Sequence, residues 1–151
     1  MKIKPRIVVS QCLEFDKCRY NGDVIPSRFV RKLNKYVDFV PVCPEVAIGL
    51  GVPRDTIKIV ERKGSVSLVQ PATKKKLTTK MNLFSRSYLN SLEDVDGFIL
   101  KSASPSCGIG DVKIYPAQDN PTPIRRGAGV FARHVLNKFD GLAIEDEGRL
   151  T

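Results

Sequence analysis

The chain has 151 residues, which fits one domain large enough to bury most of its unfolded surface without a disulfide or metal. With 25 Lys and Arg against 16 Asp and Glu, the net charge is +9. This excess favours anionic partners such as nucleic acid, although an ordinary solvated surface has the same composition. The sequence shows neither a secretory signal nor an apolar run of about 20 residues, so we expect a soluble cytoplasmic protein.

The first half of the chain predicts a strand, a helix and a second strand. An apolar run at 6–10 is typical of a buried strand, and Pro26 and Ser27 then open an amphipathic helix. The apolar positions of this helix are Phe29, Val30, Leu33 and Val37. The next apolar run, 39–42, completes a βαβ unit, whose strands should be parallel.

The second half adds a hairpin, two helices and three strands. Alternating segments within 57–70 flank Lys63 and Gly64 and predict a β-hairpin inserted after the second strand. Helices are expected from after Lys80 to about Leu92 and over 129–139, and strands at 98–101, 112–115 and 142–145. We therefore predict a single α/β domain over 1–151, with a mostly parallel, open, Rossmann-like sheet, helices on both faces and the inserted hairpin.

Three of the four cysteines follow predicted parallel strands. Cys12, Cys43 and Cys107 each come shortly after one of these strands, whereas Cys18 lies in the loop after the first. Ligands of open α/β sheets bind beyond the carboxyl ends of the strands, so the three thiols should converge there. Converging thiols predict a soft-metal or iron-sulfur site, which Cys18 could join.

The spacing of the cysteines narrows this prediction. They are separated by 5, 24 and 63 residues, so no Cys-X-X-Cys pair occurs. Zinc ribbons, thioredoxin-like redox motifs and bacterial ferredoxin runs all use such close pairs. A site assembled from distant loops fits better, and the alternative is that the thiols are small core residues.

The residues beside two of the cysteines could support chemistry. Pro44 places Glu45 near whatever Cys43 binds, although this carboxylate could instead only pair with Arg54. Hydroxyls, glycines and successive backbone amides surround Cys107 at 104–110, a composition that can cradle an anion or a cluster. The alternative is that the hydroxyls at 104 and 106 only stabilise a turn.

Five segments together resemble the signature blocks of a microbial family long labelled only as a domain of unknown function, which includes the thiouracil desulfidases. They are ValSerGlnCysLeu at 9–13, CysArgTyrAsnGly at 18–22, the segment 41–57, LeuLysSerAlaSerProSerCysGly at 100–108 and GlyValPheAlaArg at 129–133. The resemblance covers essentially the whole chain. Segments 51–57 and 147–150 look more like the corresponding segments of two-domain members of the family. In those members this domain precedes a second one and desulfurates 4-thiouridine in transfer RNA. This chain ends where that second domain would begin.

The resemblance implies a cofactor and two catalytic residues. Cys12, Cys43 and Cys107, with Gly108 beside them, would hold a 4Fe-4S cluster in which one iron lacks a protein thiolate. That iron would bind the soft thiocarbonyl sulfur as a Lewis acid. Glu45 would activate a water, with Ser104 as proton relay or substrate anchor. The sulfur would leave as hydrosulfide and the base would gain a carbonyl, with no net redox change.

The remaining assignments stay open at this point. Cys18 is either a fourth ligand or a thiol that tunes the site, and its position inside a loop favours three ligands. Candidate substrate-binding residues are Tyr20, Arg54, Ser106 and Arg126. The substrate would be free thiouracil or 4-thiouridine in transfer RNA, and a partner could replace the second domain. The rival hypotheses are a noncatalytic iron-sulfur or zinc-binding protein that uses all four cysteines, and an RNA-binding module.

Overall fold

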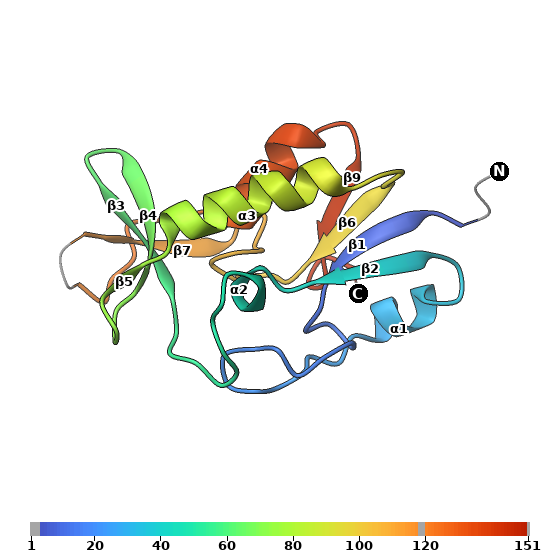
Figure 1. The fold of residues 1–151 in the computed structure, drawn as a ribbon, viewed down its shortest axis with the longest axis horizontal. Coiled ribbons are helices and arrows are strands. Elements are labelled where there is room, and N and C mark those ends of the chain that lie inside the picture. Colours follow the sequence, from blue (N-terminus) through green and yellow to red (C-terminus); the bar gives the residue numbers. More distant parts are fainter. Residues whose placement is uncertain (1–3, 118–119, 151) are drawn as a thin grey trace.

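A computed structural model describes residues 4–117 and 120–150 of the chain (Figure 1). The elements in chain order are β1 (Arg6–Ser10), α1 (Arg28–Leu33), β2 (Asp38–Val42), α2 (Pro44–Ala47), β3 (Lys58–Arg62), β4 (Ser65–Gln70), β5 (Lys75–Lys76), α3 (Thr78–Ser91), β6 (Gly97–Leu100), β7 (Val112–Pro116), β8 (Arg125–Gly127), α4 (Val130–Lys138) and β9 (Ala143–Asp146). Within the described part of the chain, no helix is long and apolar enough to cross a membrane.

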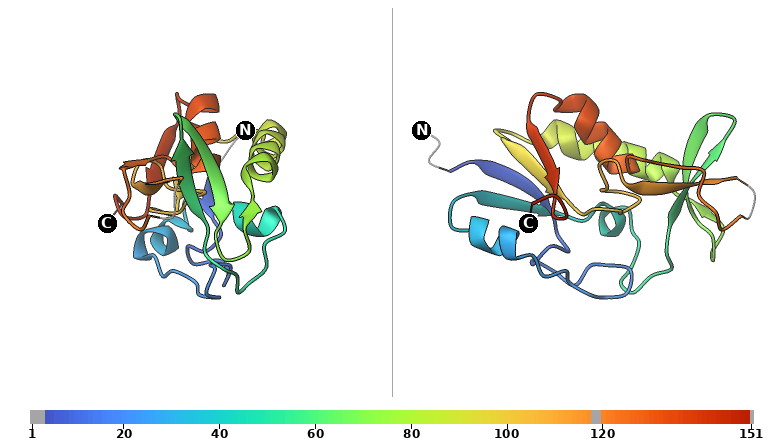
Figure 2. Two further views of the ribbon diagram at one scale, coloured as in Figure 1. Left: turned by 90° about the vertical axis from the view of Figure 1, so that its left-hand side faces the viewer. Right: turned by 180° about the vertical axis from the view of Figure 1, so that it is seen from behind.

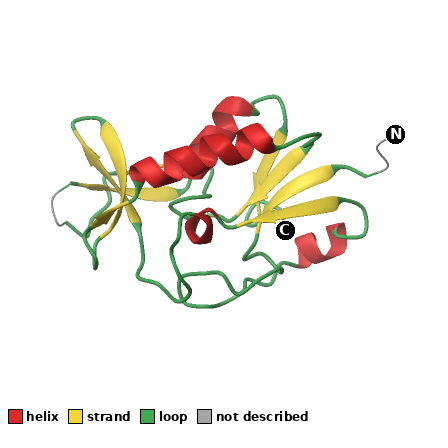
Figure 3. Ribbon diagram, in the orientation of Figure 1, coloured by secondary structure: helices red, strands yellow, loops and turns green. Residues whose placement is uncertain are grey.

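The first sheet confirms the predicted parallel architecture. Its four strands have the order β2-β1-β6-β9, and every neighbouring pair is parallel. Successive residues of a strand point to opposite faces. Val8 and Phe98 therefore belong to the core beneath α3 and α4, while Val9 and Ile99 pack with Val30 of α1. In Figure 3, α3 and α4 lie on one side of these strands and α1 on the other. Helices thus cover both faces of this sheet.

The predicted hairpin is present as β3 and β4, but it belongs to a second sheet. Lys63 and Gly64 form its turn, with φ of 50° and 79°, the positive values that a tight type I′ turn requires. The sheet has five strands in the order β5-β4-β3-β7-β8 (Figure 2). The sequence did not predict β5 or β8, because segments of two and three residues are too short to show alternation.

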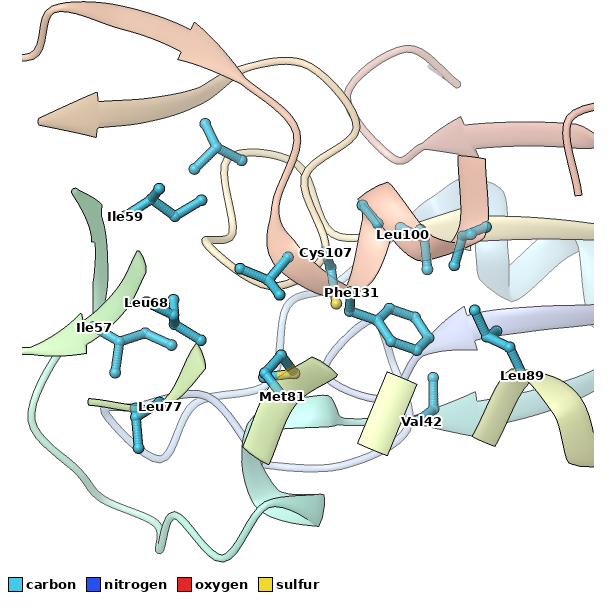
Figure 4. Close-up of a cluster of buried hydrophobic side chains, with 14 of the residues drawn as sticks. Val42, Ile57, Ile59, Leu68, Leu77, Met81, Leu89, Leu100, Cys107 and Phe131 are labelled. Carbon is cyan, nitrogen blue, oxygen red and sulfur yellow. The ribbon is translucent and has the colours of Figure 1, made fainter. Parts of the chain in front are cut away.

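The two sheets share one hydrophobic core. Its buried residues include Ile59 and Ile114 from the second sheet, Phe98 from the first, and Phe131 of α4 (Figure 4). Helix α3 extends alongside both sheets and contributes Met81, which is fully buried. Each large side chain buried in this way contributes roughly 1.5–3 kcal/mol. The shared core holds the two sheets in a fixed arrangement around the segment that carries Cys107.

The element boundaries differ from the prediction in three places. Helix α1 ends at Leu33, so Val37 is buried just before β2 and lies outside the helix. Helix α3 begins at Thr78, earlier than expected. The four-residue helix α2 was not predicted, although Pro44 occupies its first turn, where a missing N–H costs nothing. The five predicted strands of the βαβ unit and the second half agree with the structure to within one residue at each end.

Candidate active site

All four cysteines line one cavity at the carboxyl ends of the first sheet's strands. The cavity has a volume of about 240 Å³. Cys12 follows β1 by two residues, Cys43 directly follows β2, and Cys107 lies in the loop after β6. Because β1 lies between β2 and β6, these three segments leave the sheet at the same edge. The structure therefore brings together thiols that are far apart in the sequence.

Cys18 reaches the same cavity from the loop between β1 and α1. The Cys43 thiol donates a weak hydrogen bond to the Cys18 carbonyl oxygen, 3.9 Å away. The neighbouring Cys12 thiol is the main cause that raises the pKa of Cys18 to about 11. The sequence placed Cys18 only in a loop, and the structure brings it beside two of the three predicted ligands.

The other two perturbed thiols also favour the protonated form. Hydrogen bonding to Cys18, followed by burial, raises the pKa of Cys43 above its ordinary value. Burial raises the pKa of Cys107 to about 12. Thiolates bind metals and thiols do not, so loading a metal group here must release protons. Their raised pKa values distinguish these thiols from reactive cysteines, whose pKa values are lowered.

The donor set fits an iron-sulfur cluster better than a single ion. Thiolates are the soft ligands that hold such clusters. Among residues 4–117 and 120–150, no three His, Cys, Asp or Glu residues are close enough to bind one metal ion. The cavity of about 240 Å³ is several times the roughly 30 Å³ that one water occupies in the liquid. Thiols on the walls of such a space suit a group with several metal atoms.

Glu45 is held beside the thiols by two partners. Its Oε1 accepts a hydrogen bond from Arg54 Nε at 3.0 Å and lies 2.9 Å from Arg54 Nη2, and its Oε2 accepts a hydrogen bond from Ser106 Oγ at 3.1 Å. The Arg54 side chain is only 6% exposed and that of Glu45 is 14% exposed. The pairing with Arg54 that the sequence left open is therefore present. It fixes a carboxylate whose charge also helps raise the pKa of Cys43 and Cys107.

The loop that carries Cys107 is shaped by its serines. Ser104 Oγ accepts the backbone amides of Ser106 at 3.2 Å and of Cys107 at 3.0 Å, which is the turn-forming role. Ser104 also lines the cavity, and Ser10 and Ser104 partly offset the burial that raises the pKa of Cys107. Gly108 does not line the cavity. A Cβ at that position would collide with Val112, so close packing accounts for this glycine.

The two remaining candidates lie in different places. Tyr20 lines the cavity with its side chain 41% exposed, and its carbonyl accepts the Arg54 amide at 2.7 Å. Arg126 does not line the cavity. It lies on β8, where its Nη1 donates to the Asp111 carbonyl at 3.3 Å, and it borders a neighbouring hollow.

The sequence prediction missed a second ion pair at this cavity. Lys101 lines the cavity and its Nζ lies 3.1 Å from Oε2 of Glu147. Ser102 joins them, because its amide donates to Glu147 Oε1 at 2.7 Å and its hydroxyl to Oε2 at 3.0 Å. Lys101 comes directly after β6 and Glu147 directly after β9. The cysteines were selected by the rule that ligands of open α/β sheets bind beyond the carboxyl ends of the strands. This strand-end rule would have found both residues.

Comparisons with known proteins agree with this arrangement. The family model described as 2-thiouracil desulfurase matches residues 7–147. The uncharacterized protein YbbK of Bacillus subtilis (strain 168) is 33% identical, over 95% of this chain and 97% of its own. A solved structure of the 4Fe-4S-dependent thiouracil desulfidase TudS superposes with a TM-score of 0.74 at 28% identity, covering 97% of this chain and 93% of the other. The chain thus belongs to the 2-thiouracil desulfurase family.

Proposed function

We propose that this protein is an iron-sulfur-dependent desulfidase that converts a thiolated uracil to the oxygen form and releases hydrosulfide. The observation that carries the proposal is a single cavity that combines strand-end thiols with a half-buried, oriented carboxylate. Family membership and the similarity to TudS, whose structure is that of a thiouracil desulfidase, support the same reaction class.

Cys12, Cys43 and Cys107 are the proposed ligands of a 4Fe-4S cluster. They come from three neighbouring strands and line the cavity from different segments. A cluster held by three protein thiolates would supply an iron without a protein ligand, whose Lewis acidity would suit a soft thiocarbonyl sulfur. Cys18 is proposed as a nonligand, because it reaches the cavity from a loop and not from a strand end.

Glu45 is the proposed general base. Arg54 holds one carboxylate oxygen and Ser106 the other, so the group cannot rotate freely. Oε2 accepts a single hydrogen bond from Ser106, and a carboxylate oxygen can accept two, so it can also accept a proton from a water molecule. The water oxygen attacks the C=S carbon, the carbon-sulfur bond breaks and sulfur leaves as hydrosulfide. Water and the thiolated base thereby give a carbonyl and hydrosulfide, with no oxidant or reductant required.

Other cavity residues are suited to position the base. The exposed ring of Tyr20 can stack on a pyrimidine, and Ser104 is the proposed proton relay or anchor. Free thiouracil and 4-thiouridine in transfer RNA both present the same thiocarbonyl chemistry. The cavity alone does not discriminate between them, because both would place only the base near the thiols.

Anaerobic purification followed by cluster reconstitution tests the proposal. The expected result is a brown protein with about four irons per chain that converts thiouracil to uracil and releases an equal amount of hydrosulfide. The readouts are iron content, the visible absorption of the cluster, and chromatographic detection of uracil. A colourless protein that binds one zinc ion, or a loaded cluster without any turnover of thiouracil or 4-thiouridine, would contradict it.

A further inference from the structure

The second sheet is strongly basic. Its five strands carry seven cationic side chains and a single acidic one, Glu61. The cations are Lys58, Arg62, Lys75, Lys76, Lys113, Arg125 and Arg126. Glu61 is already neutralised, because its Oε1 lies 2.7 Å from Nη2 of Arg125. Much of the positive charge of the chain is therefore concentrated on this one element of the fold.

Strand register places four of these cations in one row across the sheet. Lys76 on β5 pairs with Val69 on β4, and Val69 pairs with Lys58 on β3. The register of β3 with β7, with Ile59 opposite Ile114, sets Lys58 beside Lys113. Lys113 in turn pairs with Arg126 on β8. Four of the five positions in this row are cationic.

The row lies on the face of the sheet away from the hydrophobic core. Ile59 and Ile114 point into the core, and the residues before them in the same strands point the other way. Lys76, Lys113 and Arg126 are accordingly exposed. Directly opposed like charges such as Lys113 and Arg126 destabilise a strand pair. An anionic partner would remove this repulsion.

Hollows connect this face to the thiol cavity. One, of about 410 Å³, is lined by Lys58, Arg62 and Lys76. The next, of about 520 Å³, is lined by Lys58, Lys113 and Arg126. This second hollow shares four lining residues with the thiol cavity, namely Thr56, Ile57, Ala103 and Pro105. The second hollow therefore adjoins both the row of cations and the thiol cavity.

We propose that this basic face of the second sheet binds the phosphodiester backbone of RNA. The proposal rests on the proposed function, because it assumes that a thiolated base of the bound RNA enters the thiol cavity. Neighbouring strands are about 4.8 Å apart, so a row across five strands spans roughly 19 Å. One phosphate contacts only a small part of this length, and a chain of several phosphates matches it. Tyr115, whose ring centroid lies 5.0 Å from Lys58 Nζ, adds an aromatic surface to the same face.

The test measures binding of a fluorescent transfer RNA to the reconstituted protein over a range of salt concentrations. The variant Arg62→Gln/Lys76→Gln/Lys113→Gln removes three exposed cations of this face, none of which lines the thiol cavity. Phosphate contacts release counterions, so the slope of log affinity against log salt should become shallower by about 2. Affinity at low salt should fall by about tenfold or more.

A matched variant controls for net charge. Arg28→Gln/Lys32→Gln/Lys35→Gln removes the same charge from exposed positions in and just after α1, on the first sheet. It should leave the affinity and salt slope within about twofold of the unchanged protein. An equal loss in both triple variants, or no loss in the first, would overturn the proposal. Uridine monophosphate that competes as strongly as RNA would also overturn it, because one phosphate would then suffice.

Turnover of free thiouracil separates this proposal from the proposed function. The basic-face variant should retain that activity, because a free base has no phosphate. RNA binding that depends on this face, without any desulfidation, would support the proposed RNA-binding surface and contradict the proposed desulfidase function. Turnover of free thiouracil without RNA binding would support the desulfidase function and contradict the RNA-binding surface.

Discussion

The two sheets of this protein differ in charge and in how they are covered. The first carries one cation, Arg6, against three acids, and helices pack on both of its faces. The second carries seven cations against one acid, and one of its faces is open. A sheet buried on both sides holds the groups at its strand ends rigidly, as a catalytic site requires. An open sheet can present a charged surface, so the two proposals assign chemistry to the first sheet and RNA binding to the second.

Replacing a proposed cluster ligand should have the largest effect. It should abolish only the activity that the proposal assigns to the first sheet. Cys43→Ser keeps the size of the side chain but removes the soft sulfur donor, so cluster and turnover should be lost. Iron content and visible absorption measure the cluster, and hydrosulfide release measures the reaction. Binding of RNA to the second sheet should persist in this variant. Retention of about four irons would remove Cys43 from the ligand set.

Glu45→Gln should separate proton transfer from cluster binding. The amide keeps the shape of the side chain and a hydrogen bond with Ser106, but it cannot accept the proton. We expect an unchanged cluster and a fall in kcat of about 10²–10⁴-fold. Glu45→Asp is the control, since a shorter carboxylate should recover part of the rate. Full activity of Glu45→Gln would refute the assigned role.

The shared core should couple the two sheets in stability. Phe131 is fully buried between α3 and the sheets, where it contacts Phe84 and Tyr88. Phe131→Ala should lower the free energy of unfolding by about 3–5 kcal/mol, through lost burial and the cavity left behind. Denaturant unfolding followed by circular dichroism measures the loss. Leu83→Ala, on the exposed side of α3, should change it by less than about 0.5 kcal/mol. Two separate transitions would show that the sheets unfold independently.

The sequence predicted the parts of the site that obey the strand-end rule. Apolar runs located β1, β2 and β6, and parallel strands bring Cys12, Cys43 and Cys107 to one edge of a sheet. The same rule applies to Lys101 and Glu147, which were missed because no pattern marked them as a pair until the fold brought them to 3.1 Å. The hydrogen bond from Ser106 to Glu45 joins residues 61 positions apart. No local periodicity predicts such a contact.

The second sheet shows why the rest of the fold was harder to predict. The hairpin was predicted correctly because its turn residues and alternation are local signals. The parallel pairing of β3 with β7 joins Ile59 to Ile114, and only the core contacts of both residues specify it. The row of cations depends on that register. The sequence could therefore predict a basic protein without predicting a basic face.

Replacing Cys18 should have the smallest effect, because it tests whether a thiol can line the cavity without being a ligand. Cys18→Ala removes the thiol beside Cys12 and Cys43, and this thiol is the main cause of the raised pKa of Cys43. Without that contact the pKa of Cys43 moves toward its ordinary value, so its thiolate forms at lower pH and cluster loading is not hindered. We expect about four irons per chain and turnover within about twofold of the unchanged protein.

Cys12→Ala is the matched control and should lose the cluster. A Cys18→Ala protein that loses iron to the same extent as Cys12→Ala would make Cys18 a fourth ligand. No iron would then remain open for the thiocarbonyl sulfur, and the site at the end of the first sheet would have to serve electron transfer or structure instead of desulfidation.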